Sequence, residues 1–282
     1  MKPIAVALAL VASTTVVAAD PPPKPKPGLT LPAASLNVAV NLELNASADR
    51  VGEPITIAPD LSYGVTPDLT VAVVHSLFAV TGFRARAGGG LCLNGEDGGC
   101  TNPHGFGHLY DNVGAEGWYS VARGPTAIAL GGGVHATSLS AGFYSLKLGV
   151  KLRYTIGRVG LHALPSVLLA MTGGRKSAGD NGGVSFNKSS LWIPVQATYK
   201  AISELTVGLS TGVKFLETKY TGDTYEVPLG VMATYAIDPA TTVGASWVFS
   251  KLLTGESQLP DPAPATEGVD FRGVQVWGSR TF

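Results

Sequence analysis

Residues 205–215 read LTVGLSTGVKF, and residues 224–235 read TYEVPLGVMATY. In both segments large apolar residues alternate with small or polar ones, so one face is apolar and the other is not. A period of two over about eleven residues is typical of a β-strand. The polar residues 216–223 between the segments predict the loop of a hairpin. Strands of this length with one apolar face are what a lipid-spanning β-barrel requires.

The composition fits strands with lipid on one side and a crowded interior on the other. Charged residues make up 14% of the chain, against about 25% in soluble domains, and 36 of the 282 residues are glycine. The formal net charge is zero, which gives no argument for a nucleic-acid partner. Because the alternation recurs almost throughout, we expect a single folded domain.

The N-terminus has the features of an export signal. A positive start at Lys2 precedes an apolar run over residues 4–17, and Val17, Ala18 and Ala19 form a small-residue cleavage site. We therefore predict a signal peptide at 1–19, a proline-rich periplasmic lead at 20–34 and a β-barrel at 35–282. No other stretch has some 18 consecutive apolar residues, so no helical membrane span is expected.

The alternation predicts an all-β, up-and-down antiparallel barrel of about twelve strands, with ten as the alternative. The difference lies in the segments 116–122 and 127–135, whose pattern is less clear. Both numbers are even, as a single chain with both ends in the periplasm requires. A long external loop is expected over 81–115. The remaining strands are predicted at 36–45, 55–63, 69–79, 142–154, 159–171, 190–199, 205–215, 224–235, 241–253 and 269–282.

The last nine residues, VQVWGSRTF, form a strand that closes on the aromatic Phe282. With the export signal and the alternation, this end resembles bacterial outer-membrane β-barrel proteins of the porin type. At the level of architecture the resemblance covers nearly the whole chain. It implies a Gram-negative outer membrane, contact with its lipid, and recognition of the last strand by the barrel-assembly machinery. Arg280 departs from the pattern, because the family usually has an apolar residue there.

The strongest candidate site is a set of cations that share the inward face of residues 142–162. Cations cost about 2–4 kcal/mol each near the middle of the lipid, so we expect these to face the lumen. One interpretation is a basic ladder that selects anions along a pore. The other is a lumen sealed by ion pairs to inward acids, among them Lys214 opposite Glu226 across the hairpin. The predicted lining residues are Lys147, Lys151, Arg153, Arg158, His162, Lys214, Glu226, Glu43 and Asp60.

Three functions follow from this pattern. The first is a passive diffusion channel for small hydrophilic or anionic solutes. The second is a non-conducting structural or adhesive barrel that displays its long external loop. The third is a barrel-embedded hydrolase, for which Ser145 or Ser166 near His162 is the candidate dyad. Because no convincing nucleophile motif is present, we predict no enzymatic activity and no cofactor.

The two cysteines, Cys92 and Cys100, fall within the predicted external loop. An exported chain passes through an oxidising compartment, so we predict a disulfide that pins this loop. The alternative is a zinc site that adds His104 and His108. Their spacing matches no standard zinc site, so no metal is predicted.

Overall fold

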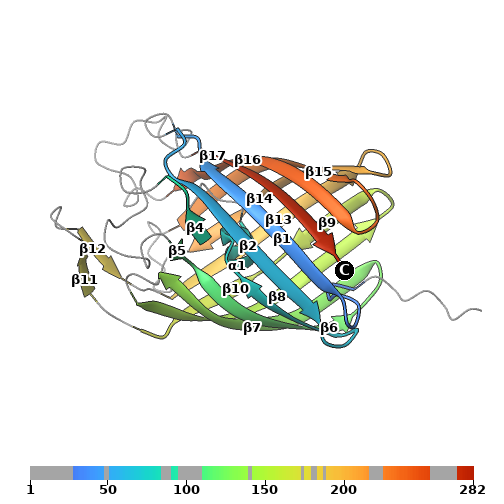
Figure 1. Cartoon of the computed structure of the whole chain (residues 1–282), viewed down its shortest axis with the longest axis horizontal. Helices are drawn as coiled ribbons and strands as arrows, with labels where there is room; N and C mark the ends of the chain where they lie inside the picture. Colours follow the sequence, from blue (N-terminus) through green and yellow to red (C-terminus); the bar gives the residue numbers. More distant parts are fainter. Residues whose placement is uncertain are drawn as a thin grey trace, which may run out of the picture.

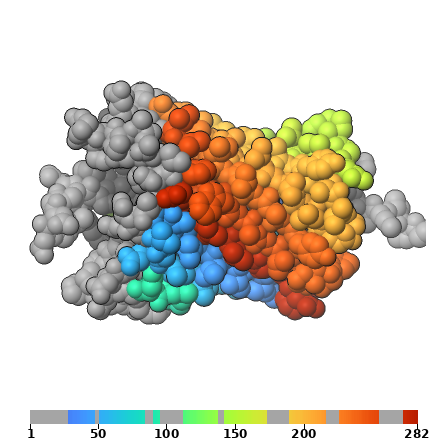
Figure 2. Space-filling model, turned by 90° about the horizontal axis from the view of Figure 1, so that it is seen from above, coloured from blue at the N-terminus to red at the C-terminus, as the bar shows by residue number. Residues whose placement is uncertain are grey.

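The chain forms one antiparallel sheet that closes on itself as a barrel in the computed structural model (Figure 1). The structure describes residues 28–47, 51–83, 90–94, 110–138, 142–172, 175–178, 183–186, 189–215, 225–254 and 272–282. Closure occurs where β1 (Leu36–Asn45) pairs with β17 (Arg272–Thr281), from Asn37 opposite Thr281 to Asn45 opposite Gly273. Figure 2 shows this seam, where the blue β1 meets the red end of the chain.

Twelve strands form the barrel wall, which confirms the higher of the two expected strand numbers. The hairpin of less clear pattern is present, and its two strands pair over most of their length. In order around the wall, the strands after β1 are β2 (Ile55–Gly64), β3 (Leu69–Val74), β6 (Val113–Ala122), β7 (Thr126–Ser138), β8 (Phe143–Ile156), the interrupted strand β9 (Val159–Ala163) with β10 (Ser166–Ala170), β13 (Ser190–Lys200), β14 (Leu205–Phe215), β15 (Tyr225–Ala236), β16 (Thr241–Thr254) and β17.

Four short strands lie at the end of the barrel where the long connections are (Figure 1). β4 (Gly90–Cys92) extends the wall beside β2, and β5 (Tyr110–Asp111) pairs with β4. β11 (Arg175–Ala178) and β12 (Gly183–Phe186) form a separate two-stranded sheet. We call this end of the barrel the loop end.

The opposite end, which we call the turn end, carries five short turns at 65–68, 123–125, 157–158, 201–204 and 237–240. Four tyrosines at the strand ends next to these turns project outward and are 44–47% exposed: Tyr63, Tyr154, Tyr199 and Tyr235. Aromatic residues in this position form the girdle that membrane barrels place at the lipid–water interface. The tyrosines thus mark one boundary of an apolar band.

The apolar band runs around the whole wall. Leu209 and Val231, paired across the β14–β15 hairpin, are 55% and 52% exposed. Each of the twelve strands exposes at least one large apolar side chain in the same way: Leu42, Leu61, Val71, Tyr119, Leu130, Leu148, Leu161, Val195, Leu209, Val231, Trp247 and Val276. A closed barrel satisfies its backbone hydrogen bonds internally, so such a surface is stable against lipid. Among the described residues, no helix is long and apolar enough to span a membrane.

The predicted strand 69–79 is wrong beyond Val74. There β3 ends and the chain turns into the barrel as the helix α1 (Leu77–Thr81). Ser76 caps the helix by accepting a hydrogen bond from the amide of Ala79 at 3.1 Å, and Gly82 ends it with a left-handed φ of 75°. This inward turn also places His75 inside the barrel at 8% exposure, although the alternation of the predicted strand 69–79 puts it on the same face as Val71 and Val73. The external loop expected over 81–115 is shorter as well, because β6 begins at Val113.

The predicted strand 159–171 is interrupted at Leu164 and Pro165, which separate β9 from β10. Proline has no amide hydrogen to donate to the sheet, so the ladder breaks at this point. The carbonyl of Pro165 still accepts from the amide of Val150 at 3.0 Å, which keeps the two halves against β8. The interruption therefore leaves the barrel wall continuous.

Candidate functional site in the barrel interior

Residues 75–83, which contain α1, cross the interior of the barrel. The segment starts at β3, and its last described residue, Phe83, reaches β14, six strands away around a wall of twelve. Phe83 is buried against Gly212, and the Lys214 ammonium lies 5.3 Å from its ring centre. Val80 packs with Val74 of β3 and with Leu168 of β10. The segment thus divides the interior into a part toward the loop end and a part toward the turn end.

Asp60 on β2 holds the point at which this segment turns inward. Its Oδ1 accepts hydrogen bonds from the amides of His75 (2.7 Å) and Ser76 (3.0 Å). Its Oδ2 accepts from the Ser76 hydroxyl and from Asn41 Nδ2. In the interpretation of a sealed lumen Asp60 would pair with a cation, but in the described part of the chain it forms no salt bridge. Its charge instead stabilises the start of α1.

A buried cluster around Glu116 on β6 lies beneath α1. Its Oε1 lies 2.6 Å from Lys147 Nζ and 3.1 Å from His135 Nε2, and its Oε2 accepts from Trp118 Nε1 at 2.6 Å. Lys147 also donates to the carbonyl of Ala79 in α1 at 3.0 Å. The side chain of Lys147 points into the barrel but has 0% exposure, so it does not line an open path. The prediction that Lys147 lines the pore is therefore wrong, because α1 covers this side chain.

A second ionic cluster lies toward the loop end. The register places Lys214 directly opposite Glu226, as the hairpin symmetry predicts, with 3.3 Å between Nζ and Oε2. Lys251 adds a second ion pair to Glu226 at 2.7 Å. Glu43, fully buried, accepts from Gln275 at 3.2 Å across the seam of the barrel. Lys214, Glu226 and Glu43, which were predicted to line the lumen, therefore join neighbouring strands of the wall in this part of the interior.

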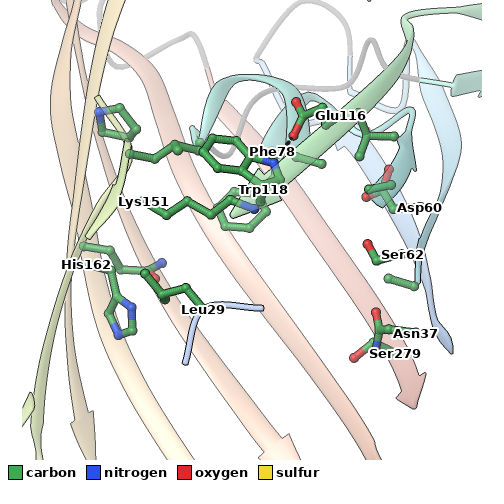
Figure 3. Close-up of a pocket in the computed structure, with 18 of the residues that line it drawn as sticks. Leu29, Asn37, Asp60, Ser62, Phe78, Glu116, Trp118, Lys151, His162 and Ser279 are labelled. Carbon is green, nitrogen blue, oxygen red and sulfur yellow. Dashed lines mark hydrogen bonds between the residues drawn. The ribbon is translucent and has the colours of Figure 1, made fainter. Parts of the chain in front are cut away.

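Between residues 75–83 and the turn end lies a chamber of about 430 Å³ (Figure 3). Lys151 and His162 line one wall of the chamber, and Figure 3 shows Asn37, Asp60, Ser62 and Ser279 on the other side. Gln196 and Trp277 add further lining. Apolar side chains, among them Phe78 and Leu164, complete the lining, and the polar groups offer hydrogen bonds to water and hydrophilic solutes.

Lys151 lines this chamber, and no carboxylate forms an ion pair with it in the described part of the chain. Its ammonium lies 4.0 Å from the ring centre of Trp118, a cation–π contact. None of the salt bridges among the described residues includes Lys151. Arg153 follows on the same inward face, opposite His162 in the register. Arg158, expected on this face too, is instead exposed in the turn 157–158, where it donates to the carbonyl of Ala201 at 3.3 Å.

Several interior aromatic rings lie over a glycine on the neighbouring strand. The register pairs Trp118 with Gly131, His135 with Gly114 and Trp277 with Gly244. A Cβ atom built on Gly244 would lie 2.2 Å from the ring of Trp277, so only glycine leaves room for it. Part of the high glycine content is therefore explained by space for large interior side chains.

Gly244→Val should lower the free energy of unfolding by about 1–3 kcal/mol, because the new side chain forces Trp277 from its place. Trp277 lines the chamber, so a shift of its fluorescence should accompany the loss. The measurement is urea unfolding in detergent micelles. Gly117→Val is the matched control, since a Cβ there meets nothing within 4 Å. Equal stability of the two variants would contradict this account of the glycines.

Sequence reasoning missed the Glu116 cluster. Glu116, Trp118 and His135 lie in the hairpin whose strands were uncertain, so their facing could not be assigned. The alternation of Glu116, Trp118 and Ser120 with exposed Tyr119 and Val121 was the available signal. Once the hairpin is accepted, the glutamate and Lys147 share the interior and are expected to pair.

The proposed hydrolase dyad is not assembled. The Thr198 hydroxyl lies 3.5 Å from His162 Nε2. Ser145 and Ser166 lie opposite His135 and Gly149 in the register instead. No group of three or more potential metal ligands occurs in the described part of the chain.

The predicted disulfide reaches only partly into the described residues. Cys92 is buried at the end of β4, opposite Thr56. Cys100, His104 and His108 lie outside the described residues. The disulfide and its zinc alternative therefore stay predictions.

Comparison with solved structures places this fold beside bacterial porins. The NanC porin aligns with a TM-score of 0.53 and 11% identity over 87% of this chain and 98% of its own. The KdgM porin aligns at 0.49 and 10% identity, over 87% and 99%. An outer membrane channel from Pseudomonas putida F1 aligns at 0.49 and 10% identity, over 90% and 97%. Neither a family model nor a curated protein sequence matches the chain.

The likeness to NanC covers nearly the whole length of both chains and is one of fold. Together with the closed wall of twelve strands and the apolar band, it defines the class: a porin-like β-barrel of the outer-membrane type.

Proposed function

We propose that this protein is a passive diffusion channel for small hydrophilic, preferentially anionic, solutes in the outer membrane of a Gram-negative bacterium. The predicted signal peptide at 1–19 supports export, and the apolar band supports insertion into lipid. The terminal strand β17, which ends next to Phe282, is the element that the barrel-assembly machinery would recognise. The porin-like fold agrees with a channel in general.

The observation that carries the proposal is the interior chamber with Lys151 in its wall. Lys147 pairs with Glu116, which offsets its charge. Lys214 and Lys251 share the one carboxylate of Glu226, and neither lysine lines the chamber. Asp60 also borders the chamber, and hydrogen bonds from four neutral donors hold its negative charge on the side away from Lys151. Lys151 therefore provides a positive field that is strengthened by the low dielectric of the wall. A field of this sign favours anions.

Reversing this charge tests the proposal. In planar lipid bilayers we expect channels with a preference for chloride over potassium. Lys151→Glu should lower the anion-to-cation permeability ratio by about tenfold, because two units of charge change inside a narrow lumen. Lys200→Glu, the same change on an exposed residue next to the turn 201–204, is the control and should have little effect. A protein that gives no channels, or a ratio that Lys151→Glu leaves unchanged, would remove the proposal.

A non-conducting structural or adhesive barrel is the second candidate. Residues 75–83 support it, because they cross the interior from β3 to β14 and narrow any path. The predicted Cys92–Cys100 disulfide, which would pin a displayed loop, is compatible with it. Titration of denatured, unreduced protein tests the disulfide, and two free thiols would exclude it. A barrel that inserts into bilayers without conducting would favour this candidate over the channel.

A further inference from the structure

The residues just before β1 fold back into the turn end of the barrel. We call residues 28–34 the entrance segment. Leu29 of this segment lines the chamber and lies close to Lys151 and His162 in the view of Figure 3. The amide of Leu31 donates to Thr70 Oγ1 at 2.8 Å, and Thr70 is a buried, inward-facing residue of β3. The entrance segment therefore occupies part of the mouth of the chamber.

Its path passes directly over Gly64 at the end of β2. A Cβ atom built on Gly64 would lie 1.9 Å from the carbonyl oxygen of Pro32, so no side chain fits beneath the segment. The amide of Ala34 donates to the carbonyl of Gly64 at 2.7 Å, and the amide of Gly64 donates to Ser35 at 2.9 Å. The end of the segment nearest β1 is thus fixed to the wall by its backbone.

At the other end of the segment, several contacts meet at the side chain of Arg123 in the turn 123–125. Its guanidinium pairs with Asp68 at 2.8 Å, donates to Thr30 Oγ1 at 3.2 Å and also donates to the carbonyl of Pro67. Thr30 in turn donates to the same Pro67 carbonyl at 2.7 Å. A Cβ on Gly28 would lie 2.8 Å from Arg123 Nη1, so the chain passes close against the guanidinium. Arg123 therefore joins two turns and the entrance segment at one point.

We propose that the entrance segment restricts access to the chamber from the turn end, and that Arg123 is the latch that holds it there. Arg123 and Asp68 are 26% and 47% exposed, so water competes for their contacts. A latch of this kind opens more easily than the buried contacts around Glu116. The inference goes beyond channel function and does not depend on it, because access can be measured without a current.

The test measures how fast a charged methanethiosulfonate reacts with a cysteine inside the chamber. The cysteine is Ser62→Cys, whose native side chain lines the chamber, in a chain that also carries Cys92→Ala and Cys100→Ala. Adding Arg123→Ala should raise the labelling rate by about tenfold, since it removes an ion pair and two hydrogen bonds from the latch. Arg158→Ala is the matched control, the same substitution on the next turn at this end, and should leave the rate unchanged.

A second variant displaces the segment by bulk instead of charge. Gly64→Val places a side chain where the Pro32 carbonyl lies and should raise the labelling rate to a similar extent. Gly117→Val, which adds the same side chain in open space, is its control. Circular dichroism confirms that each barrel is folded. If a folded Arg123→Ala or Gly64→Val barrel labels Ser62→Cys no faster than the parent, the proposal is overturned. If labelling rises while no variant conducts, the channel proposal fails and the entrance segment stands.

Discussion

Glu116→Gln should lower the free energy of unfolding by about 3 kcal/mol, because it leaves the buried Lys147 ammonium without a counter-charge. Lys147 is covered by α1 and has 0% exposure, so water cannot replace the lost carboxylate. Glutamine keeps an oxygen that can still accept from Trp118 Nε1, which limits the change to the loss of charge. Urea unfolding in detergent micelles, followed by tryptophan fluorescence, measures the effect.

Two further variants test whether the unpaired, buried charge of Lys147 causes this loss of stability. Glu116→Gln combined with Lys147→Met should recover most of the stability, because the unpaired charge is then gone. Glu226→Gln should cost about 1 kcal/mol or less, since its partners Lys214 and Lys251 retain 13% and 30% exposure. If Glu116→Gln is no more harmful than Glu226→Gln, the Glu116 cluster is not the centre of the interior that the geometry indicates.

Asp60→Ala should release residues 75–83 from their place across the lumen. The substitution removes the acceptors of two backbone amides and of Ser76 Oγ and Asn41 Nδ2. A loss of about 3 kcal/mol in the local opening free energy corresponds to roughly 100-fold faster amide exchange in this segment. Hydrogen–deuterium exchange read by mass spectrometry measures it. If the channel proposal holds, the single-channel conductance should also rise, because a wider path is open.

A substitution with a smaller expected effect, at the cap of α1, serves as the comparison for Asp60→Ala. Ser76→Ala removes the cap of α1 but keeps the Asp60 carboxylate, so it should cost about 1 kcal/mol and raise exchange about fivefold. Amides in β15 and β16 should exchange equally slowly in both variants, because β1 and β17 separate these strands from Asp60 in β2. Exchange in residues 75–83 that Asp60→Ala leaves unchanged would mean that Asp60 does not hold the segment.

The strands and the facing of their side chains were predictable from the sequence, because both depend on local geometry. Successive residues of a strand point to opposite sides, so Leu209 and Val231 on one face and Lys151 on the other are read directly from the alternation. The Lys214–Glu226 pair could be predicted for the same reason, since a hairpin loop fixes which residues stand opposite each other.

What lies inside the barrel was decided only by the tertiary structure. Residues 77–80 read LFAV, a short apolar run that fits the end of a strand as well as a buried helix, so periodicity cannot tell where the chain leaves the wall. That point is set by Asp60, fifteen residues from His75 along the chain. Likewise, Lys147 was predicted to face inward, but its burial depends on the backbone of Ala79, which the inward turn of residues 75–83 brings to it. The sequence by itself determined the wall and its two faces through contacts between neighbours. The contents of the lumen depended on contacts between residues far apart in the chain, such as Lys147 with Ala79, which no local pattern encodes.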